Sequence, residues 1–506
     1  MVRNELKSGI ILSYLNLLIG NLIPFFYTPV MLSILGQGEN GLYGIANSVM
    51  GYISLLNFGI GSAVIRYLSK YRAEKNEEAE RRVTGLFLKV YTLIAVLILV
   101  VGIFVSFHLD FYGRSLSAHE LHKLEILVRL MTVNMAFFLP FSVFSSIIIS
   151  HERYVFDKAI NILTTIGAPV VNLIMLYAGF GSVGLVVSST IINLLSYGLY
   201  TAYVLRKLCV HPSFLPCSPG LLKEILVFSG FAFLGSLVDL LYWATDKLII
   251  GWAVGASAVT VYNIGANFNS YLTGLSTAIS GILTPKISAI VTKNQSQKEL
   301  SDLFIRVGRL QFLIVSFIVS AFVVFGRWFL EIWLGSGYEL AYPVALLTMI
   351  PVSIPLIQNT GLNILYVTNK HRFRSIVYLG IAILNIVLTF IWVESYGIVG
   401  AAAATGLAYV IGNIFIINWY YYRYVGLDIP LFWKNILRML PQVIFFIVAG
   451  LYIVPQIGVH SWCAFLASSV IYTIFYYVCA YRVMMNQYER DLFAEILMKI
   501  FNKIKR

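Results

Sequence analysis

"L-Y-G-I-A-N", Leu42 to Asn47, has a close copy in the second half of the chain, where Val261 to Asn267 read "V-Y-N-I-G-A-N". A second pair lies at a similar offset of about 216 to 220 residues, because "G-S-V-G" at Gly181 to Gly184 returns as "G-I-V-G" at Gly397 to Gly400. Internal repeats of this kind, set within apolar segments, are typical of transporters that are built from two related halves. We therefore predict a tandem duplication.

The composition places the chain in a membrane. Hydrophobic residues make up 59% of it, charged residues 12%, and the mean hydropathy is +0.82, whereas about a quarter of the residues in a soluble protein are charged. Apolar runs long enough to cross a bilayer recur along the whole chain. We predict an all-α polytopic membrane protein with about fourteen transmembrane helices, each about 20 to 28 residues long.

The repeat and the connecting segments suggest a division of the chain. We expect two six-helix lobes as parallel tandem repeats, a proline-containing cytoplasmic linker between them, two further helices and an amphipathic tail. The boundaries are 1–207 for helices 1 to 6, 208–223 for the linker, 224–424 for helices 7 to 12, 425–485 for helices 13 and 14, and 486–506 for the tail. The tail either lies on the cytoplasmic leaflet or packs on the bundle.

Basic residues predict the orientation. All but five of the 36 Lys and Arg residues fall on one side of the predicted helices, and cytoplasmic loops are the ones that retain positive charge. The exceptions are Arg114, Lys123, Arg129, Lys247 and Arg327. Both termini are thus predicted to be cytoplasmic. The net charge of +13 is mostly this topology signal, and no nucleic-acid partner is expected, because no soluble basic module is present.

Two acids in the seventh predicted helix are candidate ion-coupling residues. A charged side chain at the centre of a membrane helix costs about 2.5 to 3.5 kcal/mol on insertion scales, so it should face a cavity or a partner. Asp239 and Asp246 are seven residues apart, almost two helical turns, and should point the same way. They could take up a cation or a proton. The alternative for Asp246 and Lys247 is that they mark the outer interface.

Basic and amide side chains are candidates for binding an anionic substrate. Arginine and lysine bind phosphate oxygens strongly where water is scarce, and buried amides line polar cavities or join helices. For several of the cations the alternative is anchoring at the membrane interface. The candidate substrate-binding residues are Arg66, Lys89, Arg129, Lys247, Lys286, Asn47 and Asn267.

Absent motifs exclude several classes of protein. The chain contains no P-loop, nucleophile elbow, HExxH or kinase motif, which excludes nucleotide-driven transport within this chain and argues against hydrolysis. Cys209, His211 and Cys217 lack a fourth zinc ligand. We therefore expect no metal, no cofactor and no enzyme, but a transporter.

Two stretches resemble a known family. "N-F-G-I-G-S-A-V-I-R-Y-L-S-K-Y" (Asn57 to Tyr71) and "T-D-K-L-I-I-G-W-A-V-G" (Thr245 to Gly255), continuing to "V-Y-N-I-G", resemble polysaccharide flippases of the multidrug/oligosaccharidyl-lipid/polysaccharide exporter superfamily, particularly O-antigen and capsule repeat-unit flippases. Asn57 departs from the family pattern, in which an acid is common at this place. The resemblance covers the whole chain.

The resemblance implies a V-shaped bundle of two lobes in a bacterial inner membrane. Its cargo would be an undecaprenyl-pyrophosphate-linked oligosaccharide, moved from the cytoplasmic to the outer leaflet by alternating access. An H⁺ or Na⁺ gradient would supply the energy, with Asp239 and Asp246 as the coupling acids. The expected partners are this lipid-linked oligosaccharide, membrane lipids, a polysaccharide polymerase and a chain-length regulator, and a monomer is expected to suffice.

Three alternatives remain open from the sequence. A cation-coupled drug antiporter of the same superfamily is disfavoured by the basic candidates, which suit an anionic cargo. A flippase of lipid-linked peptidoglycan precursor is a second alternative. A membrane glycosyltransferase or polysaccharide polymerase should carry a sizeable loop with catalytic acids, whereas the loops here are short.

Overall fold

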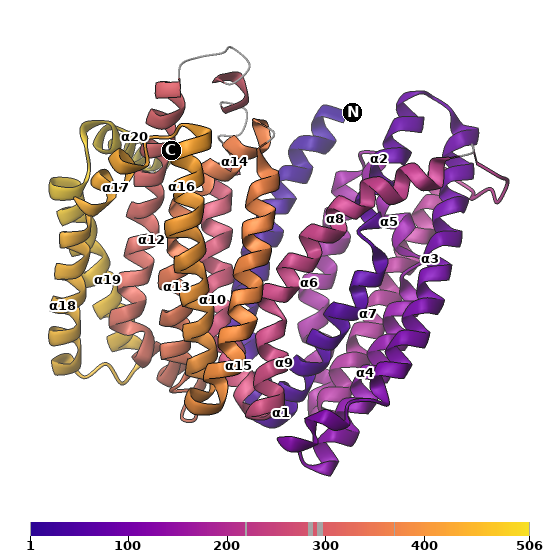
Figure 1. Ribbon diagram of the computed structural model, residues 1–506, viewed down its shortest axis with the longest axis horizontal. Helices are drawn as coiled ribbons and strands as arrows, with labels where there is room; N and C mark the ends of the chain where they lie inside the picture. Colours follow the sequence, from indigo (N-terminus) through magenta and orange to yellow (C-terminus); the bar gives the residue numbers. More distant parts are fainter. Residues whose placement is uncertain (1, 218–219, 282–286, 291–296, 369, 505–506) are drawn as a thin grey trace. The chain divides into compact units, whose positions relative to one another are not determined.

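The computed structural model of the protein describes residues 2–217, 220–281, 287–290, 297–368 and 370–504. In these ranges every regular element is a helix and none is a strand (Figure 1). A helix satisfies its backbone N–H and C=O groups within a single segment, as the interior of a bilayer requires. The predicted all-α fold is confirmed.

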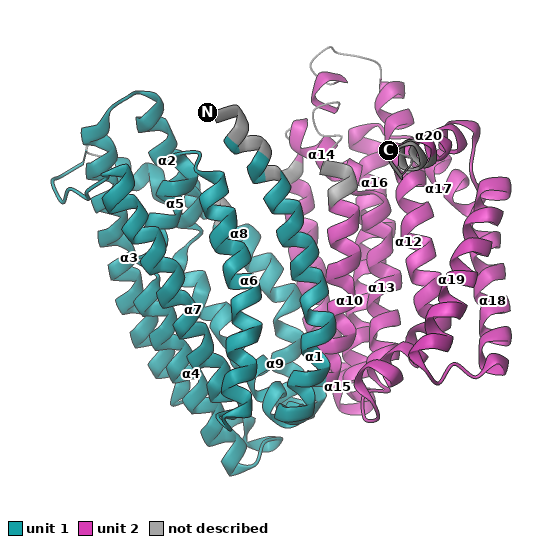
Figure 2. Cartoon of the chain, turned by 180° about the vertical axis from the view of Figure 1, so that it is seen from behind, with its two compact units in different colours: residues 1–260 teal, residues 261–506 magenta. Residues whose placement is uncertain are grey.

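The chain divides into two compact units, residues 1–260 and 261–506 (Figure 2). The boundary differs from that of the predicted lobes, since the seventh predicted helix belongs to the first unit. The lobe boundaries stay a prediction. Unit 1 contains α1 (Val2–Ser54), α2 (Ile60–Ala73), α3 (Glu77–Ser106), α4 (Ala118–Phe138), α5 (Ser142–Ser150), α6 (Tyr154–Tyr177), α7 (Gly181–Tyr203), α8 (Leu221–Trp243) and α9 (Thr245–Ala253).

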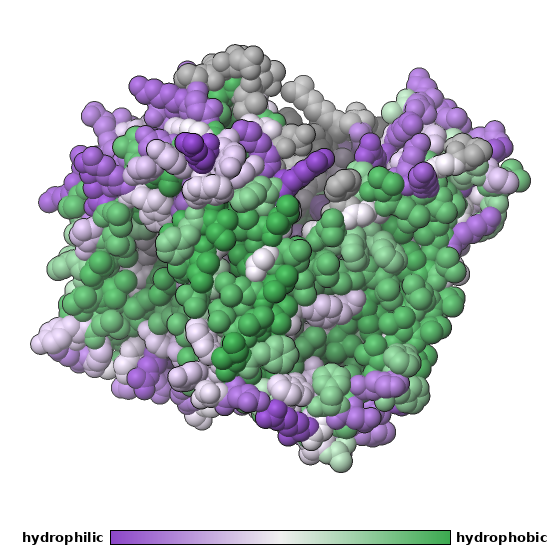
Figure 3. All heavy atoms as spheres, viewed as in Figure 1, coloured by the Kyte–Doolittle hydropathy of each residue, from purple (hydrophilic) through white to green (hydrophobic). Residues whose placement is uncertain are grey.

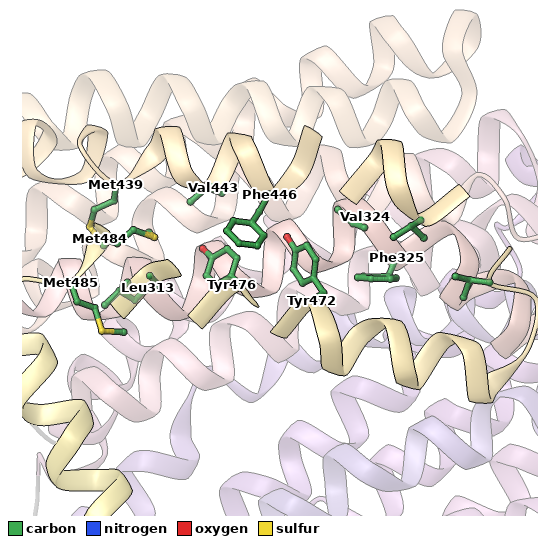
Figure 4. Close-up of a cluster of buried hydrophobic side chains, with 13 residues drawn as sticks. Leu313, Val324, Phe325, Met439, Val443, Phe446, Tyr472, Tyr476, Met484 and Met485 are labelled. Carbon is green, nitrogen blue, oxygen red and sulfur yellow. The ribbon is translucent and has the colours of Figure 1, made fainter. Parts of the chain in front are cut away.

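Unit 2 begins within α10, and an aromatic core holds its C-terminal helices together. Tyr472 and Tyr476 of α19 meet Phe446 of α18 and Phe325 of α12, with Phe446 5.1 Å from Tyr476 between ring centres (Figure 4). The described helices of this unit are α10 (Ala256–Gly281), α12 (Gln297–Leu334), α13 (Ala341–Ile357), α14 (Asn359–Val367), α15 (His371–Val410), α16 (Asn418–Tyr420), α17 (Ile429–Leu437), α18 (Leu440–Ile457), α19 (Trp462–Cys479) and α20 (Gln487–Ile504).

Helices suited to a bilayer make up both units. Among the described residues, nine segments are long and apolar enough to cross a membrane, or up to eleven if each of two bent helix pairs is one span. Ile11–Asn57 and Arg372–Val425 each cover two of the predicted spans, and each is far longer than the roughly 20 residues of a single crossing. The exact count of fourteen therefore stays a prediction. On the face shown in Figure 3, hydrophobic side chains cover the middle of the helices and hydrophilic ones gather at their ends.

The sequence repeat is visible in the backbone. Gly36 and Gly255 stand six residues before the two copies of the first repeat and have positive φ angles of 77° and 118°. Gly181 and Gly397 open the second pair, with φ angles of 54° and 56°. Glycine adopts this conformation readily, whereas it is strained for other residues. The two halves thus turn their backbones at equivalent positions.

Gly41 allows α1 to approach the first turn of α10 closely. A Cβ atom at this position would overlap the Ala256 carbonyl group, and a backbone group cannot move aside as a side chain can. We expect Gly41→Val to destabilise the fold by about 1 to 3 kcal/mol or more, the range of overpacking. The thermal midpoint of the detergent-solubilised protein measures this effect.

Gly20→Val is the matched control, because it makes the same change in the same helix. A Cβ at Gly20 would have its nearest neighbour, Thr165 Cγ2, at an ordinary contact distance of 3.9 Å. Equal midpoints for the two variants would show that the contact at Gly41 is not a constraint.

A buried ion pair attaches the C-terminal helix to unit 2. Arg309 of α12 donates from Nε and Nη2 to the two carboxylate oxygens of Glu489 in α20, at 2.7 and 2.8 Å. Nη2 also donates to the Met484 carbonyl at 2.9 Å. The two charged side chains are only 8% and 0% exposed, and Phe493 stacks on Tyr477. Of the two alternatives for the tail, the first half of α20 therefore packs on the bundle.

Candidate functional site

Helices α8 and α9 pack against the second half of α1 and against α2, which together carry most of the candidate residues of unit 1. The Tyr52 and Thr245 hydroxyls share a hydrogen bond, and the Tyr52 hydroxyl also donates to the Leu240 carbonyl at 3.5 Å. The rings of Phe58 and Phe233 lie 5.6 Å apart. These contacts hold the seventh predicted span on the second.

Arg66 is an exposed arginine on α2. Its guanidinium carbon lies 4.5 Å from the centre of the Phe228 ring of α8. The next residue, Tyr67, donates its hydroxyl to Glu224 Oε2 at 3.4 Å. Within the described ranges Arg66 makes no salt bridge. A guanidinium stacked on a ring keeps in-plane N–H donors for an anion, so Arg66 is placed to bind one.

The two candidate acids lie in different surroundings. Asp239 of α8 is exposed, whereas Asp246 in the first turn of α9 is 2% exposed and Lys247 is half-buried. Because α8 ends at Trp243 and α9 begins at Thr245, the acids do not share one uninterrupted helix. The seven-residue spacing places two side chains on one face only if the helix is continuous. The expected common carboxylate face therefore stays a prediction, as do the coupling roles.

Lys89 and Arg129 are bound by neighbouring groups. Lys89 Nζ donates to the Phe214 carbonyl at 2.8 Å, which attaches the linker to α3. Arg129 forms an ion pair with Glu125 at 3.1 Å, and its Nε donates to Ser106 Oγ at 3.1 Å. Phosphate binding by either cation stays a prediction, and it would require an exchange of these partners.

The remaining candidates are dispersed along the chain. Asn47 of α1 is exposed and donates its amide to the Tyr43 carbonyl at 2.9 Å. Asn267 is an exposed residue of α10 in unit 2. Lys286 lies outside the described residues. The structure therefore brings Arg66, Asn47 and Asp239 into one unit as exposed side chains, and their roles stay predictions.

Sequence reasoning missed a buried acid in unit 1. Asp157 at the start of α6 is 5% exposed and accepts hydrogen bonds from Tyr200 and Asn161, both at 3.2 Å. Lys158 pairs with the same carboxylate at 3.0 Å. The signal that could have revealed it is the Asp-Lys dipeptide, which occurs again at Asp246. All the partners of Asp157 that are named here lie in α6 and α7.

The arrangement in unit 1 suits binding without covalent chemistry. The exposed guanidinium of Arg66 and the exposed carboxylate of Asp239 stand on the neighbouring helices α2 and α8. In the described part of the chain, no three His, Cys, Asp or Glu side chains are grouped so as to hold a metal ion. These groups can attract charge and exchange protons.

Comparison with known proteins identifies the family. Residues 6–291 match the family described as "Polysaccharide biosynthesis protein". A Shigella flexneri protein named as an O-antigen transporter is 20% identical over 80% of this chain and 96% of its own length. An uncharacterized membrane protein of Bacillus subtilis is 22% identical over 94% of both chains.

Solved structures share the fold. A lipid II flippase, MurJ, in an inward closed conformation covers 93% of this chain and 99% of its own, with a TM-score of 0.69 and 14% identity. An inward-facing multidrug resistance transporter of the MATE family covers 84% of this chain and 99% of its own, with a TM-score of 0.62 and 14% identity. The chain thus shares its fold with these two transporters. Since the family match covers more than half of the chain, the protein belongs to the polysaccharide biosynthesis protein family, as the resemblance of its second and seventh segments predicts.

Proposed function

We propose that the protein is a flippase for undecaprenyl-pyrophosphate-linked oligosaccharide repeat units, which it moves from the cytoplasmic to the outer leaflet. Membership of the family and the name of the Shigella flexneri relative support a transporter of a polysaccharide precursor rather than an enzyme. The observation that carries the proposal is Arg66, an exposed arginine stacked on Phe228 in an apolar helical unit.

The physical chemistry of the cargo fits this site. A pyrophosphate and its sugars cannot enter hydrocarbon without losing the water that solvates them. A guanidinium with open N–H donors replaces part of that solvation by charge-assisted hydrogen bonds to phosphate oxygens. The lipid tail can stay in the bilayer meanwhile, and no bond has to be made or broken.

Orientation and energy supply belong to the same proposal. The distribution of lysine and arginine supports two cytoplasmic termini, and the bacterial relatives support a bacterial cytoplasmic membrane as the location. An H⁺ or Na⁺ gradient acting on Asp239 and Asp246 would drive alternating access by a monomer. A polysaccharide polymerase and a chain-length regulator would take up the exported unit.

Reconstitution into liposomes tests the proposal. A fluorescent undecaprenyl-pyrophosphate oligosaccharide is expected to reach the outer leaflet faster than in protein-free liposomes, as measured by quenching of the accessible dye. Lipid-linked peptidoglycan precursor and a cationic dye are assayed in parallel. Faster transport of either of these than of the oligosaccharide would replace the proposed cargo with that compound.

The coupling acids give a separate prediction. The double variant Asp239→Asn, Asp246→Asn is expected to flip the oligosaccharide at a rate that no longer responds to an imposed H⁺ or Na⁺ gradient, because an amide neither binds a proton nor carries charge. The ratio of the rates with and without the gradient is the measurement. It should fall to about one, and each single variant shows which acid is responsible.

Asp110→Asn is the control for this experiment. Asp110 is an exposed acid of unit 1 in the short helix Asp110–Arg114, so the charge change is the same. If the double variant keeps the wild-type rate ratio, neither acid couples transport to the gradient.

A further inference from the structure

In unit 2, residues at the end of α12, in the turn that joins it to α13 and at the start of α13 line a pocket of about 210 Å³. The turn contains Gly335 and Gly337, whose φ angles of 79° and 93° suit glycine, and the Gly335 N–H donates to the Glu331 carbonyl to end α12. In the proposed orientation this turn lies on the outer side of the membrane. None of the candidate residues from the sequence lines this pocket.

The inner wall of the pocket is apolar and is held in place. Leu330 and Tyr338 line it and are only 2% and 7% exposed. Tyr342 completes the wall, because its hydroxyl donates to the Val323 carbonyl at 2.6 Å and its ring stacks on Phe322. The phenol ring of Tyr342 is therefore fixed, and it offers a flat apolar surface without rearrangement.

The rim carries charge. Arg327, Glu331 and Glu339 line the same pocket and are exposed. The Gly337 N–H donates to Glu339 Oε1 at 2.9 Å, and this bond holds the pKa of the Glu339 carboxyl below its usual range. Carboxylates accept hydrogen bonds from hydroxyl groups and the guanidinium donates them. The rim has one more acid than base.

The apolar wall and the polar rim of the pocket are together complementary to the surface of a sugar ring. A pyranose has a C–H face that packs on an aromatic side chain and hydroxyl groups at its edge that need donors and acceptors. We propose that this pocket binds one neutral pyranose unit of the exported glycan as it emerges on the outer side. The excess carboxylate disfavours a uronic acid. This inference rests on the proposed function, which is what brings a glycan to this face.

Titration of free sugars into the full chain tests the pocket directly. The protein is placed in nanodiscs, and saturation-transfer NMR follows the binding of D-glucose, D-galactose, D-mannose and N-acetyl-D-glucosamine, with D-glucuronate for comparison. At least one neutral sugar is expected to bind, and more tightly than glucuronate. Absence of binding by all four neutral sugars overturns the proposal.

Two variants and a control assign the binding to this pocket. Ser336→Trp places a bulky ring at the mouth of the pocket, and Glu331→Gln removes one carboxylate of the rim. Each is expected to weaken sugar binding about tenfold, the equivalent of about 1.4 kcal/mol. Asp110→Asn, an acid of the other unit, should leave it unchanged. Unaltered binding by Glu331→Gln overturns the proposal, also where Ser336→Trp fails to fold, and so does unaltered binding by a folded Ser336→Trp.

These experiments test the pocket and the proposed function separately. The titration needs neither a gradient nor a lipid-linked cargo. If the oligosaccharide is flipped but no sugar binds, the pocket assignment is wrong and the proposed function stands. If a sugar binds in the pocket but no lipid-linked cargo moves, the proposed function is wrong and the pocket stands.

Discussion

Arg309→Met is expected to destabilise the protein by about 3 to 5 kcal/mol, because it leaves the buried carboxylate of Glu489 without its cation. The Met484 carbonyl loses its donor in the same change. Thermal unfolding of the detergent-solubilised protein should show a large fall in the midpoint and a smaller amount of protein in the membrane.

Two further variants test the cause. Arg309→Met combined with Glu489→Met removes both charges and should recover most of the lost stability, since apolar replacements of a buried pair are often neutral. Arg306→Met changes an exposed arginine of the same helix, whose guanidinium lies 4.7 Å from the Tyr488 ring, and should cost about 1 kcal/mol or less. A double variant as unstable as Arg309→Met would contradict an unpaired charge as the cause.

Arg66→Gln is expected to raise the cargo concentration needed for half-maximal flipping about 10- to 100-fold. Loss of a hydrogen bond to a charged group corresponds to roughly 1.5 to 3 kcal/mol, and about 1.4 kcal/mol is a factor of ten in affinity. Folding should not change, because the guanidinium is exposed and stacked on Phe228 rather than buried in an ion pair. Flipping in liposomes and glycan export in a complementation assay are the measurements.

Lys207→Gln serves as the control for Arg66→Gln. Lys207 is also an exposed cation of unit 1 that lies over an aromatic ring, that of Tyr203 at 5.2 Å. A general effect of charge on insertion would appear in both variants. If Arg66→Gln flips the oligosaccharide like the wild type, the anion site at Arg66 does not exist.

The fold was largely predictable because one constraint dominates it. Apolar runs of membrane length must become helices, since lipid offers no partner for an open backbone. The short repeat at Leu42 was equally informative, because the glycines that precede its two copies both have positive φ angles. The number of membrane spans was less predictable from the sequence. The backbone is not helical at Gly36 and Gly397, so α1 and α15 are each two helices joined at a kink, and each covers two predicted spans.

The candidate site was predictable only in part, because spacing along a helix does not reveal partners from elsewhere. Arg66 is exposed, whereas Lys89 donates to a linker carbonyl 125 residues away. The partner of Arg309 is 180 residues distant, and no local pattern links the two. Likewise no local pattern marks Asp246 as buried, although it is only 2% exposed in the first turn of α9.

The matched glycine turns carry a consequence for the ancestry of the chain. Gly36 with Gly255, and Gly181 with Gly397, are positions where only a residue without a side chain is unstrained. A gene duplication would have copied these bends together with the helices between them. Later substitutions could then change almost every other residue of the two copies. The positive-φ glycines therefore preserve the evidence of a duplication better than the surrounding sequence, in which the two halves now agree only in a few short motifs.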